Sequence, residues 1–287
     1  MSQFPNASRF RGRNAIVTGA SRGIGAALSQ RLAAEGANLL LVARTLAEPG
    51  RLAGTLRETQ EICRRYGNWV EVLAADLSDP ASRARIVPAA LDHFDGRVDI
   101  LVNNAAAAIY ALNLDYPLRR RHLSFEVNFH APFDLMQDVL PGMVERGEGW
   151  IVNVSSGSAH LVTGPPRFDV EPTARVIGVY GASKAALNRI TNAFAVEFHG
   201  RGIRINTIEP RAAVMSEGAE ILVGDSVRED QIESMEGMVE AIAALCACEP
   251  DRTGQILESL QLLEELRATI MSLDASRPHK ETQSGRR

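Results

Sequence analysis

The chain has 287 residues, with 31 lysines and arginines against 35 aspartates and glutamates, a formal net charge of −4. Its 45% hydrophobic and 23% charged residues are typical of a soluble globular protein and exclude a disordered chain, a collagen and a disulfide scaffold. The three cysteines cannot all pair with one another and lack zinc-ligand spacing, so we expect a reducing cytoplasm and no metal site.

Short apolar runs alternate with longer amphipathic ones along the chain. Strands are expected at 14–18, 38–43, 69–74, 98–103, 150–155, 203–208 and 255–257. Most of these runs are continuously apolar, as in strands that are covered on both faces. Helical periodicity occupies the intervals 23–35, 51–66, 81–95, 118–146, 181–199 and 228–245. This alternation predicts an α/β fold, a Rossmann-like doubly wound three-layer sandwich around a parallel seven-stranded sheet.

No linker-like break divides the chain, so we predict a single Rossmann-like domain over 13–258 after an N-terminal extension, 1–12. Segment 157–179 holds Gly164 and three prolines, which predict a long irregular loop of functional importance. After the last strand, leucines and an isoleucine at three- and four-residue spacing predict an additional amphipathic helix over 259–274. The polar segment 275–287 is expected to be a flexible tail.

The first predicted strand continues directly into a glycine-rich turn, Thr18–Gly25, and then into a helix. Gly19 permits the tight turn, Gly23 lets the backbone approach a pyrophosphate, and Gly25 allows the helix to pack closely on the strand. The N-terminus of the helix supplies free N–H groups and a partial positive charge for an anion. Strand, turn and helix in this order predict a dinucleotide phosphate site.

The end of the second predicted strand bears on cofactor choice. Dinucleotide sites place an acid there for a free ribose 2′-hydroxyl, or an arginine for a 2′-phosphate. Here Arg44 follows the strand, no acid occupies 42–45, and Arg22 in the glycine turn could reach the same phosphate. We therefore expect NADP(H) to be preferred, with NAD(H) left open.

Tyr180 and Lys184 lie four residues apart at the start of a predicted helix, so their side chains share one face. A nearby ammonium favours the phenolate and would lower the pKa of the tyrosine from about 10, producing a usable acid/base. The run Asn153-Val154-Ser155-Ser156 ends the preceding strand. In an open parallel sheet, ligands bind at the carboxyl ends of the strands, where this run lies.

Taken together, these motifs resemble the short-chain dehydrogenase/reductase family over roughly 13–257. The matching residues are Thr18–Gly25, Asp76, Asn103-Asn104-Ala105-Ala106, Asn128, Ser156, Tyr180-x-x-x-Lys184 and the stretch 206–210. The resemblance implies that Tyr180 exchanges a proton with the substrate oxygen, that Lys184 binds the nicotinamide ribose and tunes Tyr180, and that Ser156 hydrogen-bonds the reacting oxygen. It also implies that Asn128 holds a water that relays protons.

The resemblance further implies a set of cofactor contacts, with Asp76 facing the adenine and Asn103 with Ala105 lining the adenosine side. The whole set is Gly19, Ser21, Arg22, Gly23, Ile24, Gly25, Arg44, Asp76, Leu77, Asn103, Ala105, Tyr180 and Lys184. Two alternatives stay open: Ser155 rather than Ser156 could hydrogen-bond the reacting oxygen, and Asn128 could merely satisfy backbone groups. Asn104 is expected to tie strands together rather than to contact the cofactor.

The chain departs from the family pattern after Pro210, where Arg211 replaces the usual glycine and Met215 stands in the place of a cofactor-binding threonine. Ser216 is the candidate substitute for that threonine. Segment 216–236 corresponds to the family's lid and carries seven acids and one arginine, which disfavour a polyanionic substrate. The basic run Arg119-Arg120-Arg121 could instead meet an acyl carrier or coenzyme A.

These observations predict a cytoplasmic, NADPH-preferring oxidoreductase that interconverts a small-molecule carbonyl and alcohol, with Tyr180 as general acid/base. The alternatives are a 3-oxoacyl thioester reductase with the same machinery and a non-catalytic nucleotide-binding regulatory protein. A homodimer or homotetramer is expected. Neither nucleic acid nor membrane is expected as a partner, because the net charge is negative and no apolar run approaches the ~20 residues that span a bilayer.

Overall fold

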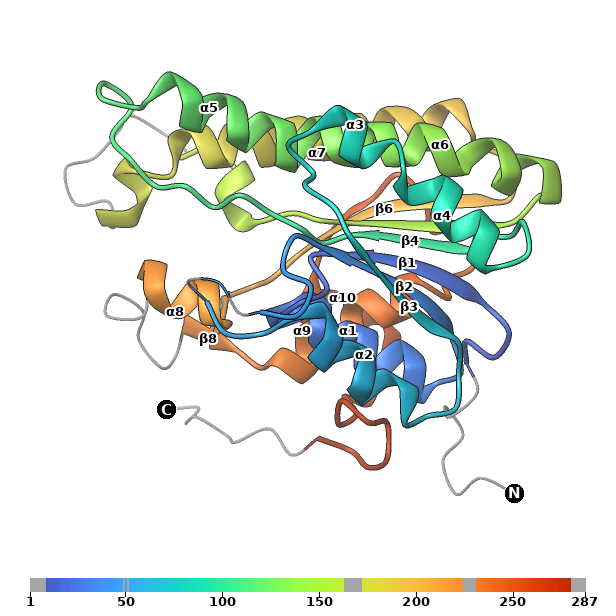
Figure 1. The fold of residues 1–287 in the computed structure, drawn as a ribbon. Helices are drawn as coiled ribbons and strands as arrows, with labels where there is room; N and C mark the ends of the chain where they lie inside the picture. The colour runs from blue at the N-terminus through green and yellow to red at the C-terminus, as the bar shows by residue number, and fades with distance from the viewer. Residues whose placement is uncertain (1–8, 49, 51, 163–171, 224–230, 280–287) are drawn as a thin grey trace.

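Seven parallel strands form the central sheet, in the order β3-β2-β1-β4-β5-β6-β9 (Figure 1). They are β1 Asn14–Thr18, β2 Asn38–Ala43, β3 Val70–Ala74, β4 Ile100–Asn103, β5 Gly149–Val154, β6 Ile203–Glu209 and β9 Ile256–Glu258. The computed structural model describes residues 9–48, 50, 52–162, 172–223 and 231–279. The predicted Rossmann-like α/β fold with a seven-stranded parallel sheet is confirmed.

Helices cover both faces of the sheet (Figure 1). One layer contains α1 Gly23–Ala34, α2 Leu56–Arg64, α9 Met235–Leu245 and α10 Ser259–Leu266. The other contains α3 Pro80–Arg83, α4 Ile86–His93, α5 Leu118–Phe125, α6 Ala131–Arg146 and α7 Gly178–Glu197. Within the residues described, no helix has the length and apolar character needed to cross a membrane.

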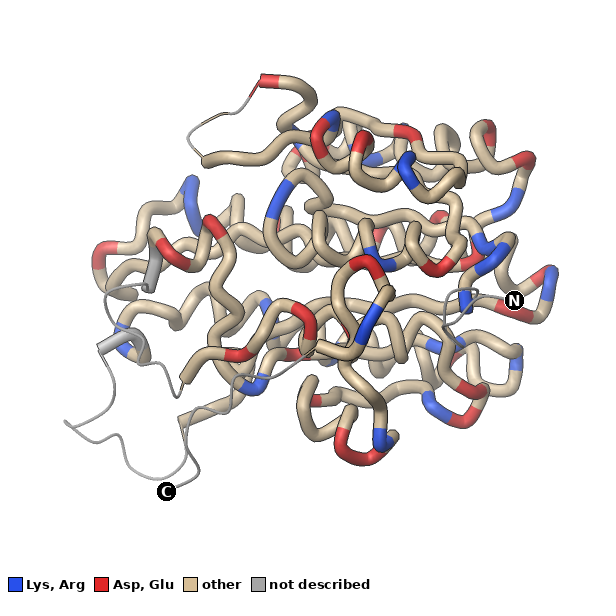
Figure 2. The backbone as a smooth tube through the Cα atoms, turned by 90° about the horizontal axis from the view of Figure 1, so that it is seen from below, with Lys and Arg blue, Asp and Glu red and all other residues tan. Residues whose placement is uncertain are grey.

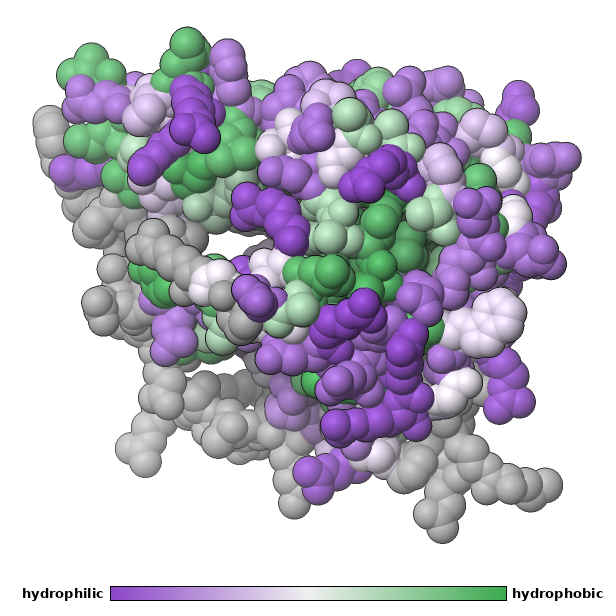
Figure 3. Space-filling model, viewed as in Figure 1, coloured by the Kyte–Doolittle hydropathy of each residue, from purple (hydrophilic) through white to green (hydrophobic). Residues whose placement is uncertain are grey.

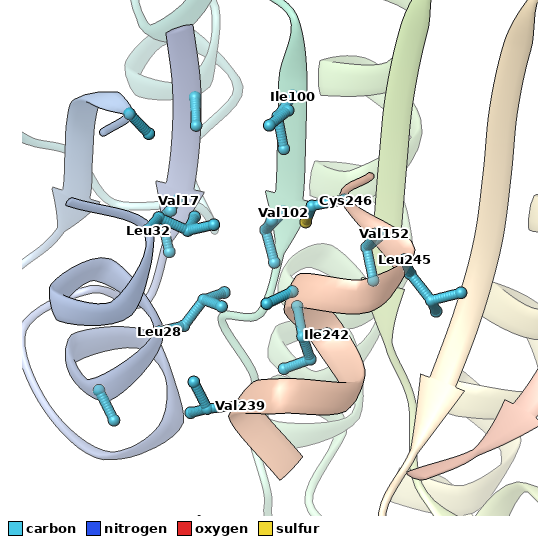
Figure 4. Close-up of a cluster of buried hydrophobic side chains, with 14 of the residues drawn as sticks. Val17, Leu28, Leu32, Ile100, Val102, Val152, Val239, Ile242, Leu245 and Cys246 are labelled. Carbon is cyan, nitrogen blue, oxygen red and sulfur yellow. The ribbon is translucent and has the colours of Figure 1, made fainter. Parts of the chain in front are cut away.

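Each helical layer seals its own apolar core against the sheet. Figure 4 shows Leu28 of α1 and Val239 and Ile242 of α9 in one buried cluster with Val17 and Val102 of the strands. All five side chains are fully buried, and burial of each contributes about 1.5–3 kcal/mol relative to exposure. The strand order reverses between β1 and β4, so the crevice at their carboxyl ends is where this fold binds ligands.

A buried cluster of charges joins the first layer to both ends of the described chain. Arg31 is 0% exposed and forms ion pairs with Glu35 and Glu240, which also pair with Arg9. Nη1 of Arg31 donates to the carbonyl oxygens of Met271 and Ser272. Because each buried charge has an opposite partner, the cluster avoids the large cost of an isolated buried ion. Elsewhere basic and acidic positions are interspersed (Figure 2).

Several predicted boundaries differ from the structure. The helix predicted over 51–66 begins only at Leu56, because Thr55 caps it through a capping box with Glu58. The window 81–95 contains two helices, α3 and α4, and the window 118–146 contains α5, a π-helical turn Glu126–His130 and α6. The helix predicted over 259–274 ends at Leu266, because Arg267 adopts a left-handed conformation with φ +49°.

The segments expected to be irregular are only partly so. After α10 the chain turns back on itself, with a bridge between Met271 and Pro278, so residues 275–279 of the predicted tail pair with preceding residues. The predicted loop 157–179 contains 3₁₀ turns at Gly157–Ala159 and Pro172–Arg175 and the first residues of α7. Segment 216–236 contains α8 Glu217–Val223 and β8 Ile232–Glu233, which pairs with β7 Ala213–Val214. Residues 163–171, 224–230 and 280–287 lie outside the described residues.

Candidate active site

A cleft of about 490 Å³ opens at the carboxyl ends of β1, β4 and β5. The surface is hollowed there between α5 and α8 (Figure 3). The cleft brings together most of the predicted site residues: Gly19, Ser21, Arg22, Gly23, Ile24, Arg44, Asp76, Leu77, Ala105, Ser156, Tyr180 and Lys184. Gly25, Asn103 and Asn128 do not line it and support its walls from behind.

The glycine turn between β1 and α1 has the shape of an anion site. A Cβ atom on Gly25 would collide with the carbonyl oxygen of Gly19, so only glycine lets the helix pack this closely on the turn. Helix α1 begins at Gly23 with no side-chain cap and no acid in its first turn. Its first N–H groups are therefore available to an anion, and the helix dipole favours negative charge at the same point. These residues fit the diphosphate of a dinucleotide.

Two asparagines, the last residue of β4 and the one after it, hold the strand ends together. Asn104 Nδ2 donates to the carbonyl oxygen of Thr18 at 2.9 Å, and the Asn104 N–H donates to Thr18 Oγ1 at 3.1 Å. Asn103 Nδ2 donates to Asn153 Oδ1, its register partner on β5, at 2.8 Å. These contacts match the expected tie at Asn104 and show that Asn103 contributes a buried cross-strand bond rather than a side chain in the cleft.

Tyr180 and Lys184 project from the first turns of α7 towards the end of β5. Tyr180 is 8% exposed, and the side chain of Ser156 is near enough to act on the pKa of its phenol. Lys184 Nζ donates to the carbonyl oxygen of Val154 at 2.7 Å and lies 6.0 Å from the centroid of the Tyr180 ring. One helix face and one strand end therefore place a phenol, a hydroxyl and an ammonium group in the same corner of the cleft.

Burial governs the proton affinities of this corner. It raises the pKa of Tyr180 above its ordinary value, the neighbouring phenol of Tyr110 acts in the same direction, and the bond with Ser156 opposes both. Lys184 was expected to bring the pKa of Tyr180 below its ordinary value, whereas burial raises it. Burial also lowers the pKa of Lys184, to about 8. The phenol therefore keeps its proton at neutral pH and suits a proton donor.

The two serines at the end of β5 have different surroundings. Ser156 acts on the pKa of Tyr180, and its Oγ accepts hydrogen bonds from the N–H and hydroxyl of Ser158 at 3.2 and 3.0 Å. Ser155 Oγ is buried and has no hydrogen-bond partner among the described residues. Of the two candidates, Ser156 is the one connected to the phenol.

Asn128 lies in the π-helical turn between α5 and α6 and is 0% exposed. Its Oδ1 accepts from the N–H of Ala107 at 2.8 Å, and its Nδ2 donates to Ser183 Oγ at 2.9 Å and to the Ala107 carbonyl at 3.2 Å. The side chain therefore fastens the wall after β4 to α7, as in the alternative that Asn128 satisfies backbone groups. The wide turn that carries it is a feature often found at functional sites.

Sequence reasoning did not find Tyr110, which lines the same cleft. Its ring centroid lies 5.8 Å from that of Tyr180 at an interplanar angle of 56°, and burial raises its pKa. The only available signal was a lone aromatic residue after the run Asn103–Ala108. Such a residue could equally have belonged to the core, and only the folded chain brings it beside Tyr180.

The opposite end of the cleft carries charge. Burial opposes ionisation of Asp76, but hydrogen bonds from the N–H and hydroxyl of Ser78 and the positive charge of Arg44 outweigh it and lower the pKa of the carboxyl. Arg44 is exposed at the rim. Arg22, which was expected beside it, instead donates to backbone carbonyls of residues 52–54.

The stretch after Pro210 explains how an arginine is accommodated. The Arg211 guanidinium turns away from the cleft and pairs with Glu258 and Glu264. The backbone N–H of Arg211 donates to buried Glu233 at 2.9 Å. Ser216 lines the cleft, whereas Met215 is not among the lining residues. A Cβ atom on Gly23 would lie 2.9 Å from Ser216 Cβ, so the start of α8 rests on the glycine turn.

A cleft that fits a dinucleotide, with buried Tyr180 and Lys184 and half-buried Ser156 in one corner, fits a nicotinamide-dependent oxidoreductase. The family model for short chain dehydrogenases matches residues 13–220. The chain is 34% identical over 248 residues to oxidoreductase UcpA of Escherichia coli, covering 86% of this chain and 87% of that one. It is 35% identical over 204 residues to 1,6-dihydroxycyclohexa-2,4-diene-1-carboxylate dehydrogenase of Pseudomonas putida, covering 70% and 67%.

The fold also matches a metagenomic short-chain oxidoreductase solved in complex with NADP, with a TM-score of 0.68 and 26% identity. That match covers 88% of this chain and 99% of the other. The chain therefore belongs to the short-chain dehydrogenase/reductase family and is an NAD(P)-dependent oxidoreductase.

Proposed function

We propose that this protein is an NADPH-preferring oxidoreductase that interconverts a carbonyl and an alcohol, with Tyr180 as general acid/base. The observation that carries the proposal is that Tyr180, Ser156 and Lys184 line one cleft, with Lys184 Nζ 6.0 Å from the Tyr180 ring, and that the uncapped glycine turn lines the same cleft. A bound nicotinamide supplies the hydride in the reducing direction and accepts it in the other.

The residues of the chain provide the proton and the geometry. Ser156 holds the substrate oxygen, and Tyr180, whose raised pKa keeps the phenol protonated, donates its proton to that oxygen. Lys184, fixed by the carbonyl of Val154, binds the nicotinamide ribose and stabilises the phenolate that remains. We propose that Asn128 supports the proton relay indirectly. It joins Ala107, after β4, to Ser183 of α7 and so fixes this wall of the cleft.

The proposed preference for NADPH rests on Arg44. Its exposed guanidinium lies at the rim of the cleft after β2, where the 2′-phosphate of the adenosine ribose would lie. An arginine matches the geometry of a phosphate and can bind it through two parallel hydrogen bonds. Asp76, held ionised by Ser78 and Arg44, is proposed to face the adenine.

The substrate end of the cleft suggests the kind of molecule that is reduced. Among the described residues it is lined mainly by small and apolar side chains, including Ala107, Tyr110, Leu123, Val127 and Val214. The arginines at 119–121 are exposed on α5 and are not among the lining residues. An uncharged carbonyl compound therefore fits better than a thioester of a polyanionic carrier.

NADPH oxidation with ketones, aldehydes, quinones and acetoacetyl thioesters tests the function, with Tyr180→Phe as the control for catalysis at this site. Turnover of a ketone, aldehyde or quinone that the variant loses supports the proposal. Turnover restricted to acetoacetyl thioesters would favour the 3-oxoacyl thioester reductase. Tight NADPH binding with no turnover of any substrate would favour the non-catalytic nucleotide-binding protein.

A second copy of the chain is the proposed partner. An apolar groove of about 360 Å³ lies between α6 and α7, lined by side chains such as Phe133, Leu140, Phe194 and Phe198. Apolar surface of this kind is typical of subunit interfaces, so we propose a homodimer or homotetramer, to be tested by sedimentation. All three cysteines are free thiols, which suits the proposed cytoplasmic location.

A further inference from the structure

The side chain of Arg22 crosses from the glycine turn to the loop between β2 and α2. Its Nε donates to the carbonyl oxygen of Ala53 at 2.7 Å, and its Nη2 lies 3.1 Å from the carbonyl oxygen of Gly54 and 3.4 Å from that of Leu52. Nη2 is also 3.3 Å from Thr45 Oγ1. The edge of the guanidinium formed by Nε and Nη2, one of the edges that can grip a phosphate with two bonds, is therefore occupied by the chain itself.

The loop is built to receive this side chain. Gly54 has φ +93°, and a Cβ atom there would lie 2.5 Å from the carbonyl oxygen of Ser21, so the loop backbone rests directly on the glycine turn. At its base, the N–H of Leu56 donates to the carbonyl of Thr45, and the N–H of Arg57 to the carbonyl of residue 46. These two bonds close the loop at its base, and Arg22 holds residues 52–54 beside it.

The position of the loop matters to the cofactor because Leu52 lines the cleft beside Arg44 and Asp76. Leu52 is the residue whose carbonyl Arg22 contacts, so the clasp sets where this wall of the adenosine end lies. Arg44, by contrast, donates no hydrogen bond to any described residue, and its whole guanidinium is available to a ligand.

We propose that Arg22 is a positioning residue that clasps residues 52–54 over the glycine turn and so shapes the adenosine wall for NADPH and NADH alike. In this proposal, discrimination between the two cofactors belongs to Arg44 rather than to Arg22. This inference rests on the proposed function only in the identity of the cofactor.

The test compares Arg22→Gln and Arg22→Lys with Arg44→Gln, and uses Arg57→Gln as a matched control. The Arg57 guanidinium contacts Gln60 within α2, so this variant removes one nearby positive charge without touching the clasp. Dissociation constants of the full chain for NADPH and NADH are measured by fluorescence titration at fixed ionic strength. Hydrogen exchange of residues 45–56 is measured without cofactor, and thermal midpoints check that each variant is folded.

Both Arg22 variants are expected to weaken NADPH and NADH by the same factor, about tenfold, because the wall that includes Leu52 is no longer held in place. Arg22→Lys is not expected to restore cofactor affinity, because one ammonium group cannot replace the two adjacent donors of the guanidinium. Exchange of residues 45–56 is expected to rise in both Arg22 variants and to stay unchanged in Arg44→Gln and Arg57→Gln. Only Arg44→Gln is expected to change the ratio of the two dissociation constants.

Loss of NADPH affinity alone in Arg22→Gln, with recovery in Arg22→Lys, would make Arg22 a phosphate ligand and overturn the inference. Unchanged affinities, or unchanged exchange of residues 45–56, would overturn it too. Failure of the wild-type chain to bind either cofactor would instead contradict the proposed function, and the exchange measurement would still decide whether the clasp exists.

Discussion

Lys184 lies under the ring of Tyr180, with its Nζ 6.0 Å from the ring centroid and hydrogen-bonded to the carbonyl oxygen of Val154. Both groups are almost fully enclosed, so burial pushes both towards their neutral forms: it raises the pKa of the phenol and lowers that of the ammonium. Tyr180 is therefore protonated at neutral pH, whereas Lys184 begins to lose its proton just above neutral pH.

Replacing Tyr180 with phenylalanine removes the proton donor and leaves the ring in place. We expect kcat to fall about 10²–10⁴-fold, the usual contribution of general acid catalysis, with NADPH affinity nearly unchanged. The measurement is kcat with a verified substrate together with the NADPH dissociation constant. A variant that keeps more than roughly a tenth of the wild-type kcat would show that another group supplies the proton.

The pH dependence of the reaction should report Lys184. Because burial lowers its pKa to about 8, the ammonium is present at neutral pH and is lost as the pH rises through that value. Tyr180, with a raised pKa, remains protonated over the same interval. We expect kcat/KM for carbonyl reduction to be level up to about pH 7.5 and to fall above about pH 8. A profile that stays level to about pH 9.5 would contradict this role.

Replacing Arg44 with aspartate places like charge beside the 2′-phosphate. One charged bond contributes about 1.5–3 kcal/mol, so Arg44 alone predicts a wild-type preference for NADPH of about 10- to 100-fold in kcat/KM. The variant should lose this preference while using NADH at least as well. Arg57→Asp makes the same change of charge outside the cleft and should preserve the ratio. A wild-type ratio near one would mean that Arg44 is only a surface charge.

Glu217, at the start of α8, brings a carboxylate to the glycine turn: its Oε2 lies 3.6 Å from the point where a Gly23 Cβ would be. A negative charge there opposes the diphosphate of either cofactor. We expect Glu217→Gln to tighten NADPH and NADH by about two- to fivefold at low salt, and by less at high salt because the site is exposed. Glu220→Gln, on the same helix, serves as the control. If Glu217→Gln and Glu220→Gln tightened cofactor binding equally, the net charge of the protein and not the position of Glu217 would explain the effect.

The fold could be predicted because its signals are local. Short apolar runs such as 39–43 and 100–102 are typical of strands in a sheet covered on both faces, and the helical windows between them predict crossovers. Gly19 and Gly25 mark the turn because the backbone leaves no room there for a side chain. The spacing of Tyr180 and Lys184 follows from the helix period. Each of these features depends on residues within a few positions of one another.

Only the tertiary structure decided the rest, because it depends on residues far apart in the chain. Helix α10 ends at Leu266 because Arg267 adopts a left-handed backbone conformation, which the hydrophobic periodicity of the sequence does not predict. The clasp of Arg22 requires carbonyls some thirty residues away, and the place of Tyr110 requires the chain to pass over α7. Burial, which sets the pKa of Tyr180, exists only in the packed molecule. Sequence determined which chemical groups were present, whereas packing decided their contacts and their charge.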